Sequence, residues 1–248
     1  MKVFITGGTT GIGFGLCELY LKEGHQVGIC GRSLSKLPEG FLEKYPNLKC
    51  YQLDVLDKEA FAKAVKGFSN GDLDLIIANA GISGRKDTSM VDFNLAKEIL
   101  NTNIFGVLNT FEVGLGEFLP KKMGHIAVIA SVAGLVGLPW APAYSASKAA
   151  VLSLGESFAI SQKKNGIHVT SIAPGFIDTP LTKRNKYKMP FLLTLEEGAK
   201  EIKDAIDRKE VLYVFPWQMK ILMCFLNKIP RWLYRFLMGL NLVDYSGK

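Results

Sequence analysis

The sequence predicts a single α/β domain with a doubly wound parallel sheet. Short apolar runs such as Val3–Thr6, Val27–Cys30 and Leu73–Ala78 alternate with longer stretches of helical pattern. Strands separated by helices form βαβ units, which build parallel sheets. The 248 residues are enough for one such domain, and no linker or repeat interrupts them. With 48% hydrophobic and 21% charged residues, the composition is that of a globular chain.

The elements follow one another without long gaps. The predicted strands are Val3–Thr6, Val27–Cys30, Leu48–Leu53, Leu73–Ala78, Ile126–Ala130, Val169–Ala173 and Val211–Pro216. The predicted helices are Phe14–Glu23, Lys58–Phe68, Phe93–Asn101, Gly106–Leu119, Tyr144–Lys163, Trp217–Asn227 and Arg231–Leu240. The run ending at Ala78 is apolar throughout its second half, which is typical of a parallel strand buried on both faces.

The charge and the cysteines limit the possible partners. The formal net charge of +7 suits nucleic acid, a membrane surface or an anionic ligand. The basic excess lies mostly after residue 180 and forms no nucleic-acid motif, so we expect no nucleic-acid partner. The four cysteines and three histidines lack ligand spacing, which predicts no metal site and reduced thiols in a cytoplasmic protein. We also expect neither a signal peptide nor a membrane span.

A glycine-rich loop, T-G-G-T-T-G-I-G, follows the first strand directly. Glycines between a strand and a helix let the backbone approach a pyrophosphate, which then lies at the helix N-terminus. The spacing is G-x-x-x-G-x-G rather than the commoner G-x-G-x-x-G. The loop therefore predicts a Rossmann-type dinucleotide site that includes Gly7, Thr9, Thr10, Gly11, Ile12 and Gly13.

The end of the second strand indicates which dinucleotide binds. An NAD site normally carries an acidic residue there for the ribose 2′-hydroxyl. This chain has Gly31, Arg32 and Ser33, with no acid before Glu39. A guanidinium and a hydroxyl suit a 2′-phosphate, so NADP(H) is favoured and NAD(H) is the alternative. The competing interpretation is that Arg32 is a solvated surface residue.

Tyr144 precedes Lys148 by four residues in A-Y-S-A-S-K-A-A. In a helix the two side chains lie on one face. A nearby ammonium favours the phenolate and so suits a tyrosine that transfers a proton, since its ordinary pKa is ~10. Alone, a Y-x-x-x-K pattern is more often a packed tyrosine beside a solvated lysine.

Seven motifs in order make the chain resemble the short-chain dehydrogenase/reductase family from Lys2 to about Thr182. They are T-G-x-x-x-G-x-G at Thr6–Gly13, D-V at Asp54–Val55, N-A-G at Asn79–Gly81, Asn103 in N-I-F-G, Ser131 after a strand, Y-x-x-x-K at Tyr144–Lys148, and P-G at Pro174–Gly175 leading to Thr179. Each motif is weak by itself, but chance agreement of the whole series is remote.

The resemblance implies roles for these residues. Tyr144 would be the general acid or base, Ser131 would hydrogen-bond the substrate oxygen, and Lys148 would bind the nicotinamide ribose and lower the pKa of Tyr144. Asn103 would hold a water that links Lys148 to solvent. The cofactor contacts implied elsewhere are Asp54 and Val55 at the adenine, Asn79, Ala80 and Gly81 at its ribose, and Pro174, Gly175, Ile177 and Thr179 at the nicotinamide end.

Two variable regions are expected to bind the substrate. In Gly134–Pro142, the side chains of Leu135, Val136, Leu138 and Trp140 offer an apolar wall. In the loop 180–195, Lys183, Arg184, Lys186 and Lys188 interleave with apolar residues. Both regions fit a lid over a lipophilic substrate, although a solvated basic loop is an equal alternative.

The C-terminal part departs from the common family form. We expect residues 1–210 to form the NADP(H)-binding catalytic unit, and 211–248 a final strand with an apolar, basic helical extension of the same domain. The two tail helices, hinged at Pro230, would pack on a subunit or cap the pocket, or lie on a membrane surface. A homodimer through the helices at Phe93–Leu119 and Tyr144–Lys163 is expected rather than the usual tetramer.

Together these features predict an oxidoreductase that transfers hydride between NADP(H) and a carbonyl/alcohol substrate. The alternatives are a dinucleotide-binding regulator and a membrane-surface protein of the same fold. The four residues Asn103, Ser131, Tyr144 and Lys148 argue against a regulator, which needs none of them for chemistry.

Overall fold

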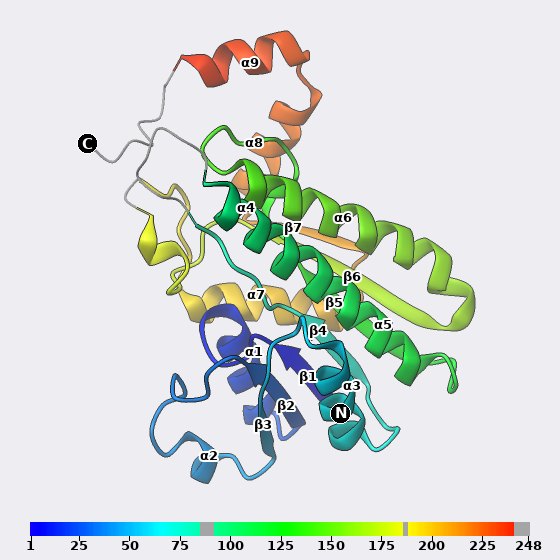
Figure 1. Cartoon of the computed structure of the whole chain (residues 1–248). Helices are drawn as coiled ribbons and strands as arrows, with labels where there is room; N and C mark the ends of the chain where they lie inside the picture. The colour runs from blue at the N-terminus through cyan, green and yellow to red at the C-terminus, as the bar shows by residue number, and fades with distance from the viewer. Residues whose placement is uncertain (85–91, 186–187, 241–248) are drawn as a thin grey trace.

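A seven-stranded parallel sheet forms the centre of the molecule, and helices cover both of its faces (Figure 1). The structure is a computed structural model that describes residues 1–84, 92–185 and 188–240. The strand order is β3-β2-β1-β4-β5-β6-β7, and each pair of neighbours runs parallel. The prediction of a single doubly wound α/β domain is therefore confirmed.

The elements have the following bounds. The strands are β1 (Lys2–Thr6), β2 (Gln26–Gly31), β3 (Leu48–Gln52), β4 (Leu75–Ala78), β5 (Gly124–Ile129), β6 (Ile167–Pro174) and β7 (Leu212–Phe215). The α-helices are α1 (Gly11–Lys22), α2 (Phe41–Lys44), α3 (Lys58–Ser69), α4 (Phe93–Leu100), α5 (Gly106–Phe118), α6 (Pro142–Gln162), α7 (Leu195–Asp207), α8 (Trp217–Lys228) and α9 (Arg231–Gly239).

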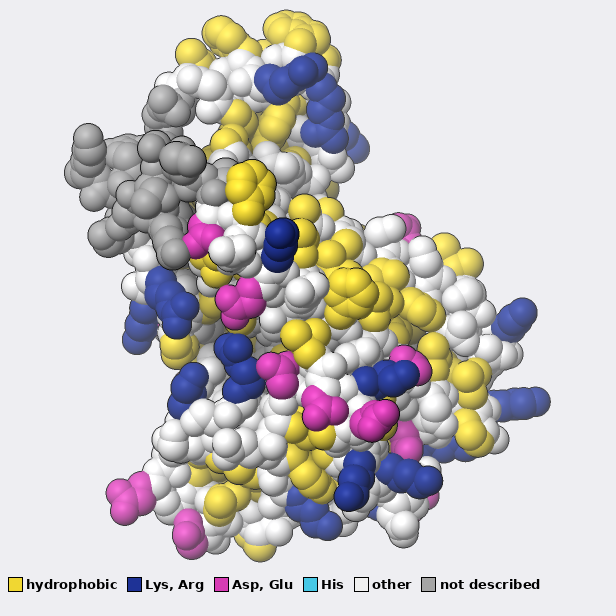
Figure 2. Space-filling model, in the orientation of Figure 1, with side chains coloured by type: hydrophobic (Ala, Val, Ile, Leu, Met, Phe, Trp, Pro, Cys, Tyr) yellow, Lys and Arg dark blue, Asp and Glu magenta, His cyan; other side chains and the backbone are white. Residues whose placement is uncertain are grey.

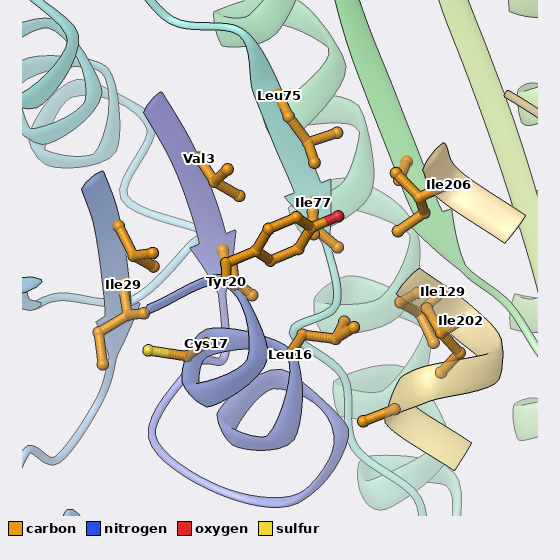
Figure 3. Packing of buried hydrophobic residues seen from close by; sticks show 14 of the residues in the cluster. Val3, Leu16, Cys17, Tyr20, Ile29, Leu75, Ile77, Ile129, Ile202 and Ile206 are labelled. Carbon is orange, nitrogen blue, oxygen red and sulfur yellow. The ribbon is translucent and has the colours of Figure 1, made fainter. Parts of the chain in front are cut away.

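The core has two layers because strand side chains alternate between the faces of the sheet. Val3 and Ile5 face the layer of α1 and α7, whereas Phe4 faces the layer of α3, α5 and α6. Figure 3 shows the first layer, in which Tyr20 of α1 and Ile206 of α7 lie over the strands. Both faces of the central strands β1, β4 and β5 are thus buried, which explains their nearly continuous apolar sequences.

The strand order reverses between β1 and β4. The chain runs outward through β1, β2 and β3, then crosses to the other side of β1 and continues from β4 to β7. In such sheets, ligands bind at the carboxyl ends of the strands beside this switch point. The glycine loop after β1 and the segment after β4 meet there.

Several boundaries differ from the predicted ones. α1 begins at Gly11 rather than Phe14, so the helix includes the last residues of the glycine loop. A π-helix at Asn101–Phe105 joins α4 to α5, so the two predicted helices form one continuous helical run. The sequence prediction lacked the short α2 and also α7, although Thr194 and Glu197 form a capping box at the start of α7.

The tail continues the same fold. β7 pairs with β6 at the edge of the sheet, and α8 and α9 follow within one residue of the predicted ends. Residues 241–248, which the predicted extension included, lie outside the described residues. Within the described ranges, no helix combines the length and the apolar character needed to cross a bilayer.

Candidate active site

A cavity of about 640 Å³ opens at the carboxyl ends of the central strands. It is lined by residues that directly follow β1, β2, β4 and β5 and by the end of β6. Of the predicted site residues, the lining contains Gly7, Thr9, Thr10, Gly11, Ile12, Arg32, Ser33, Asp54, Val55, Asn79, Ala80, Gly81, Ser131, Tyr144, Lys148, Pro174, Gly175, Ile177 and Thr179. The fold therefore gathers segments from across the chain at one place.

The glycine loop bends tightly at this edge of the sheet. Gly7 and Gly11 have φ angles of +65° and +56°, which glycine adopts without strain. A β-carbon at Gly7 would lie only 2.9 Å from the Cα of Ala80. The first N–H groups of α1 have no intrahelical partners, as in any α-helix, and the side chain of Thr10 does not cap them. These features suit the pyrophosphate of a dinucleotide.

Gly13 lies behind the cavity and does not line it. A β-carbon there would lie 2.4 Å from the Nδ2 of Asn79. That nitrogen donates hydrogen bonds to the carbonyl oxygens of Thr6 at 2.9 Å and Gly7 at 3.1 Å. The glycine therefore makes room for an asparagine that joins the end of β4 to the loop after β1.

The end of β2 places two cations beside the cavity. Arg32 and Lys36 both line it, together with Ser33. The Nη1 of Arg32 lies 4.0 Å from Glu98 Oε1, and the two side chains are 63% and 56% exposed. Such an exposed ion pair contributes little free energy, so it leaves the guanidinium available to a stronger anion.

The Tyr144–Lys148 pair is on α6. The Nζ of Lys148 lies 5.7 Å from the centroid of the Tyr144 ring and donates a 2.8 Å hydrogen bond to the carbonyl oxygen of Ile129. Lys148 is only 5% exposed, and burial lowers its pKa from 10.5 to about 8. The ammonium is therefore still the main form at neutral pH, close to the phenol.

Ser131 begins a short 3-10 helix, Val132–Gly134, directly after β5. Its Oγ accepts a 3.2 Å hydrogen bond from the backbone N–H of Ala133. The hydroxyl proton is not used in that contact. It can thus be donated to an oxygen in the cavity, which the serine shares with Tyr144.

Asn103 is fully buried in the π-helix and does not line the cavity. Its Nδ2 donates to the carbonyl oxygen of Ile82 and to Ser147 Oγ, both at 3.0 Å. A β-carbon at Gly81 would lie 3.1 Å from Asn103 Oδ1 and 3.6 Å from Lys148 Nζ. These two polar atoms therefore border the same small space beside Gly81.

The structure adds site residues that the motifs did not include. They are Lys36, Leu53, Ile82, Ser83, Thr102, Ile129, Ala130 and, from the predicted substrate loop, Pro180, Leu181, Thr182 and Arg184. Lys36 could have been found as a second cation four residues after Arg32. The four of them from Pro180 to Arg184 lie in a loop that the sequence already indicated as a substrate region. The remaining residues have no signal in the sequence, because they reach the cavity only through the packing of their elements.

The predicted apolar wall is wrong for this cavity, because none of its four residues, Trp140 included, lines it. Leu135, Val136 and Leu138 pack in a cluster with Met219 and Met223 of α8 and do not line the cavity. Apolar side chains on this loop are buried best against another apolar element, and the tail supplies one. Of the predicted basic loop, Lys186 lies outside the described residues, and Lys183 Nζ lies 3.6 Å from Asp178 Oδ1.

Comparisons with known proteins agree with this geometry. The family model described as "short chain dehydrogenase" matches residues 1–189. An uncharacterized oxidoreductase of Myxococcus xanthus is 31% identical over 222 residues, which cover 88% of each protein. A short chain dehydrogenase of Burkholderia cenocepacia in complex with NADP has a TM-score of 0.82 at 25% identity, covering 95% of this chain and 96% of its own.

A second solved structure, ElxO with NADP bound, has a TM-score of 0.75 at 28% identity, covering 86% of this chain and 96% of its own. The family match spans most of the chain and includes the glycine loop, Ser131, Tyr144 and Lys148, which the fold brings to one cavity. On this evidence the chain belongs to the short-chain dehydrogenase/reductase family of oxidoreductases.

Proposed function

We propose that the protein is an NADP(H)-dependent dehydrogenase or reductase that interconverts a carbonyl and an alcohol. The observation that carries this proposal is the single cavity that the glycine loop, Ser131, Tyr144 and Lys148 share. A cavity that adjoins a dinucleotide loop and also contains a phenol, a hydroxyl and an ammonium suits hydride transfer coupled to proton transfer.

Each polar side chain has one task in this proposal. NADPH would supply the hydride that converts the carbonyl carbon to an alcohol carbon. The Tyr144 hydroxyl donates the proton to the carbonyl oxygen in reduction and accepts it in oxidation. Ser131 hydrogen-bonds that oxygen where negative charge develops. The Lys148 ammonium stabilises the phenolate that Tyr144 becomes after proton donation.

Asn103 would act behind this trio. Both amide protons of Asn103 already take part in hydrogen bonds. Its Oδ1 accepts one hydrogen bond, from the N–H of Ile82 at 2.8 Å, and can accept one more. A water in the small space beside Gly81 would contact both this oxygen and Lys148 Nζ. Such a water would return protons from solvent to the lysine and then to Tyr144.

The preference for NADP(H) over NAD(H) rests on charge. Arg32 and Lys36 can both approach a 2′-phosphate, and no acidic residue lies between the end of β2 and Glu39 to bind free ribose hydroxyls. Two similar solved structures hold NADP. NAD(H) remains the alternative, and it would be favoured if Arg32 stayed with Glu98.

The substrate is proposed to be a lipophilic carbonyl or alcohol. Since the predicted wall does not line the cavity, Ile82 and Leu181 of the lining would supply the apolar contacts with the substrate. Phe191 and Leu192 on the predicted lid are half exposed and could add to them when the lid closes. Arg184, which also lines the cavity, would suit an anionic group on such a molecule.

A homodimer through α4, α5 and α6 belongs to the same proposal. These helices and the π-helix between them expose Phe93, Phe105 and Ile160. Apolar side chains this exposed are typical of a surface that another subunit covers.

The proposal can be tested with a panel of ketones, aldehydes and alcohols, followed by the absorbance of NADPH. Wild-type protein should turn over at least one lipophilic member, and Tyr144→Phe should not. A protein that binds NADPH but turns over no member of the panel in either direction would instead be the regulatory alternative.

A further inference from the structure

We propose that the outward faces of α8 and α9 bind the surface of an anionic lipid bilayer. Six exposed apolar residues define this face, here called the tail patch: Trp217, Ile221 and Phe225 on α8, Trp232 and Phe236 on α9, and Leu240 directly after it. Trp217 and Trp232 are 66% and 68% exposed, and a contiguous exposed apolar patch of this kind marks an interaction surface.

The spacing places each set on one side of its helix. Trp217, Ile221 and Phe225 recur every four residues, and so do Trp232, Phe236 and Leu240. Side chains four residues apart lie on the same helix face. Two apolar ridges therefore point outward from the tail, and α9 projects beyond the rest of the molecule (Figure 1).

The opposite faces hold the helices in this orientation. Met219 and Met223 of α8 are buried in a cluster with Val136 and Val214. Tyr234 of α9 is buried as well, and its hydroxyl donates a 2.6 Å hydrogen bond to the carbonyl oxygen of Gly137. Turning the tail patch inward would break these contacts, so the patch cannot be hidden by rotating the helices.

The charge around the patch identifies the partner. The segment from Trp217 to Leu240 contains no Asp or Glu and four cations: Lys220, Lys228, Arg231 and Arg235. All four are exposed, and within the described part of the chain none forms a salt bridge. Figure 2 shows dark blue side chains beside yellow ones at the α9 end of the molecule. Aromatic residues flanked by Lys and Arg suit an anionic lipid interface.

A second copy of the chain fits this face less well. In a twofold contact the same surface meets itself, so the four cations of one subunit would approach the four of the other. The patch offers no carboxylate to pair with them, and like charges brought together oppose binding. An anionic bilayer neutralises the cations and also accepts the aromatic side chains.

The patch is joined to the active site by packing. The cluster beneath α8 and α9 also contains Val132, which directly follows Ser131, and Val136 of the next loop. Binding of the tail to a bilayer would therefore bring this side of the site close to the lipid surface. The lipid proposal does not depend on the proposed reaction, since it rests on the tail alone.

The full chain can be tested by sedimentation with vesicles of phosphatidylglycerol and phosphatidylcholine, and with vesicles of phosphatidylcholine alone. Wild-type protein should sediment with the anionic vesicles at low salt and be released as salt rises. The double variant Trp232→Ser and Phe236→Ser should bind at least ~tenfold more weakly, because it loses the apolar contact. The triple variant Lys220→Gln, Lys228→Gln and Arg235→Gln should bind anionic vesicles more weakly by a similar factor, because it loses three of the four cations. Arg231 is kept because its guanidinium lies over the Tyr234 ring.

A matched control is the double variant Leu42→Ser and Met123→Ser. These residues are 49% and 61% exposed, but lie on α2 and before β5, away from the tail and from the proposed dimer surface. This control should bind vesicles like wild type. NADPH binding and thermal unfolding should show that every variant is folded. The proposal is overturned if wild type fails to bind anionic vesicles, or if the tail and control variants lose the same affinity for them. It is also overturned if the variant with Trp232→Ser and Phe236→Ser has half the molecular mass of wild type in solution, since the patch would then be a subunit interface.

Discussion

Asn103 holds the main chain of Ile82 through two hydrogen bonds. Its Oδ1 accepts from the N–H of Ile82 at 2.8 Å, and its Nδ2 donates to the carbonyl oxygen of the same residue at 3.0 Å. A residue of the π-helix therefore positions the segment after β4, where Gly81 and Ile82 line the cavity.

Replacing this amide should loosen the site. Asn103→Ala removes three hydrogen bonds made by a buried side chain, so the free energy of unfolding should fall by about 2–3 kcal/mol. Urea denaturation measures this, and turnover should fall as well. Asn101→Ala is the control, because Asn101 is in the same π-helix but is exposed. Equal stability of the two variants would contradict the proposed positioning role.

Tyr144→Phe should lower turnover by at least ~100-fold, which is the size expected for a lost general acid. The ring and its contacts remain, so NADPH binding should change little. Steady-state kinetics and a fluorescence titration of NADPH measure the two effects. Turnover close to that of the wild type would remove Tyr144 from the mechanism.

Lys148 should make stability depend on pH. Its folded pKa of about 8 is below its ordinary 10.5, so between these values the unfolded chain binds more protons than the folded chain. Stability from this group therefore rises with pH in that window. From about pH 7 to about pH 9.5, the unfolding free energy of wild type should gain about 1–2 kcal/mol relative to Lys148→Met.

Urea denaturation of both proteins at the two pH values isolates the lysine, because the other titrating groups are common to both. A difference that stays constant, or that falls as pH rises, would show that Lys148 keeps an ordinary pKa in the folded protein.

Cofactor choice should depend on Arg32 and Lys36. Charge-assisted contacts contribute ~1.5–3 kcal/mol, so wild type should bind NADPH roughly ten- to hundredfold more tightly than NADH. Arg32→Gln with Lys36→Gln should remove most of this preference and leave NADH affinity nearly unchanged. Titration of both reduced cofactors measures it. Equal or tighter binding of NADH by wild type would show that these cations face solvent.

Reversing the preference requires more than an acid at the end of β2. A β-carbon at Gly31 would lie 3.0 Å from both Cγ2 and Oγ1 of Thr9, so Gly31→Asp alone is crowded. Combined with Arg32→Gln and Thr9→Ala, it should favour NADH, because the carboxylate repels a 2′-phosphate and accepts from free hydroxyls.

Deletion of Trp217–Lys248 should cause aggregation or a changed oligomeric state. It uncovers Val132, Val136 and Val214, which α8 and α9 now bury. The milder Tyr234→Phe loses the hydrogen bond to Gly137 and should reduce stability by about 0.5–1.5 kcal/mol. Light scattering and thermal unfolding measure the outcomes. A truncated protein of unchanged mass, solubility and activity would exclude a packing role for the tail.

The sequence by itself determined the order of the strands along the chain and most residues of the cavity. The central strands were visible because both of their faces are buried, and the glycine loop because a tight turn needs Gly7 and Gly11. The motifs at Ser131 and Tyr144 lie directly after β5 and near the start of α6, so their place follows from the order of the elements.

Only the tertiary structure decided the contacts between distant segments. Local pattern shows that Val136 will be buried, but not whether a substrate or α8 will bury it. The hydrogen bonds from Asn103 to Ile82 join residues that are 21 positions apart. Such pairings depend on how the helices pack on the sheet, and the sequence encodes that packing through many weak contacts at once rather than through a local motif.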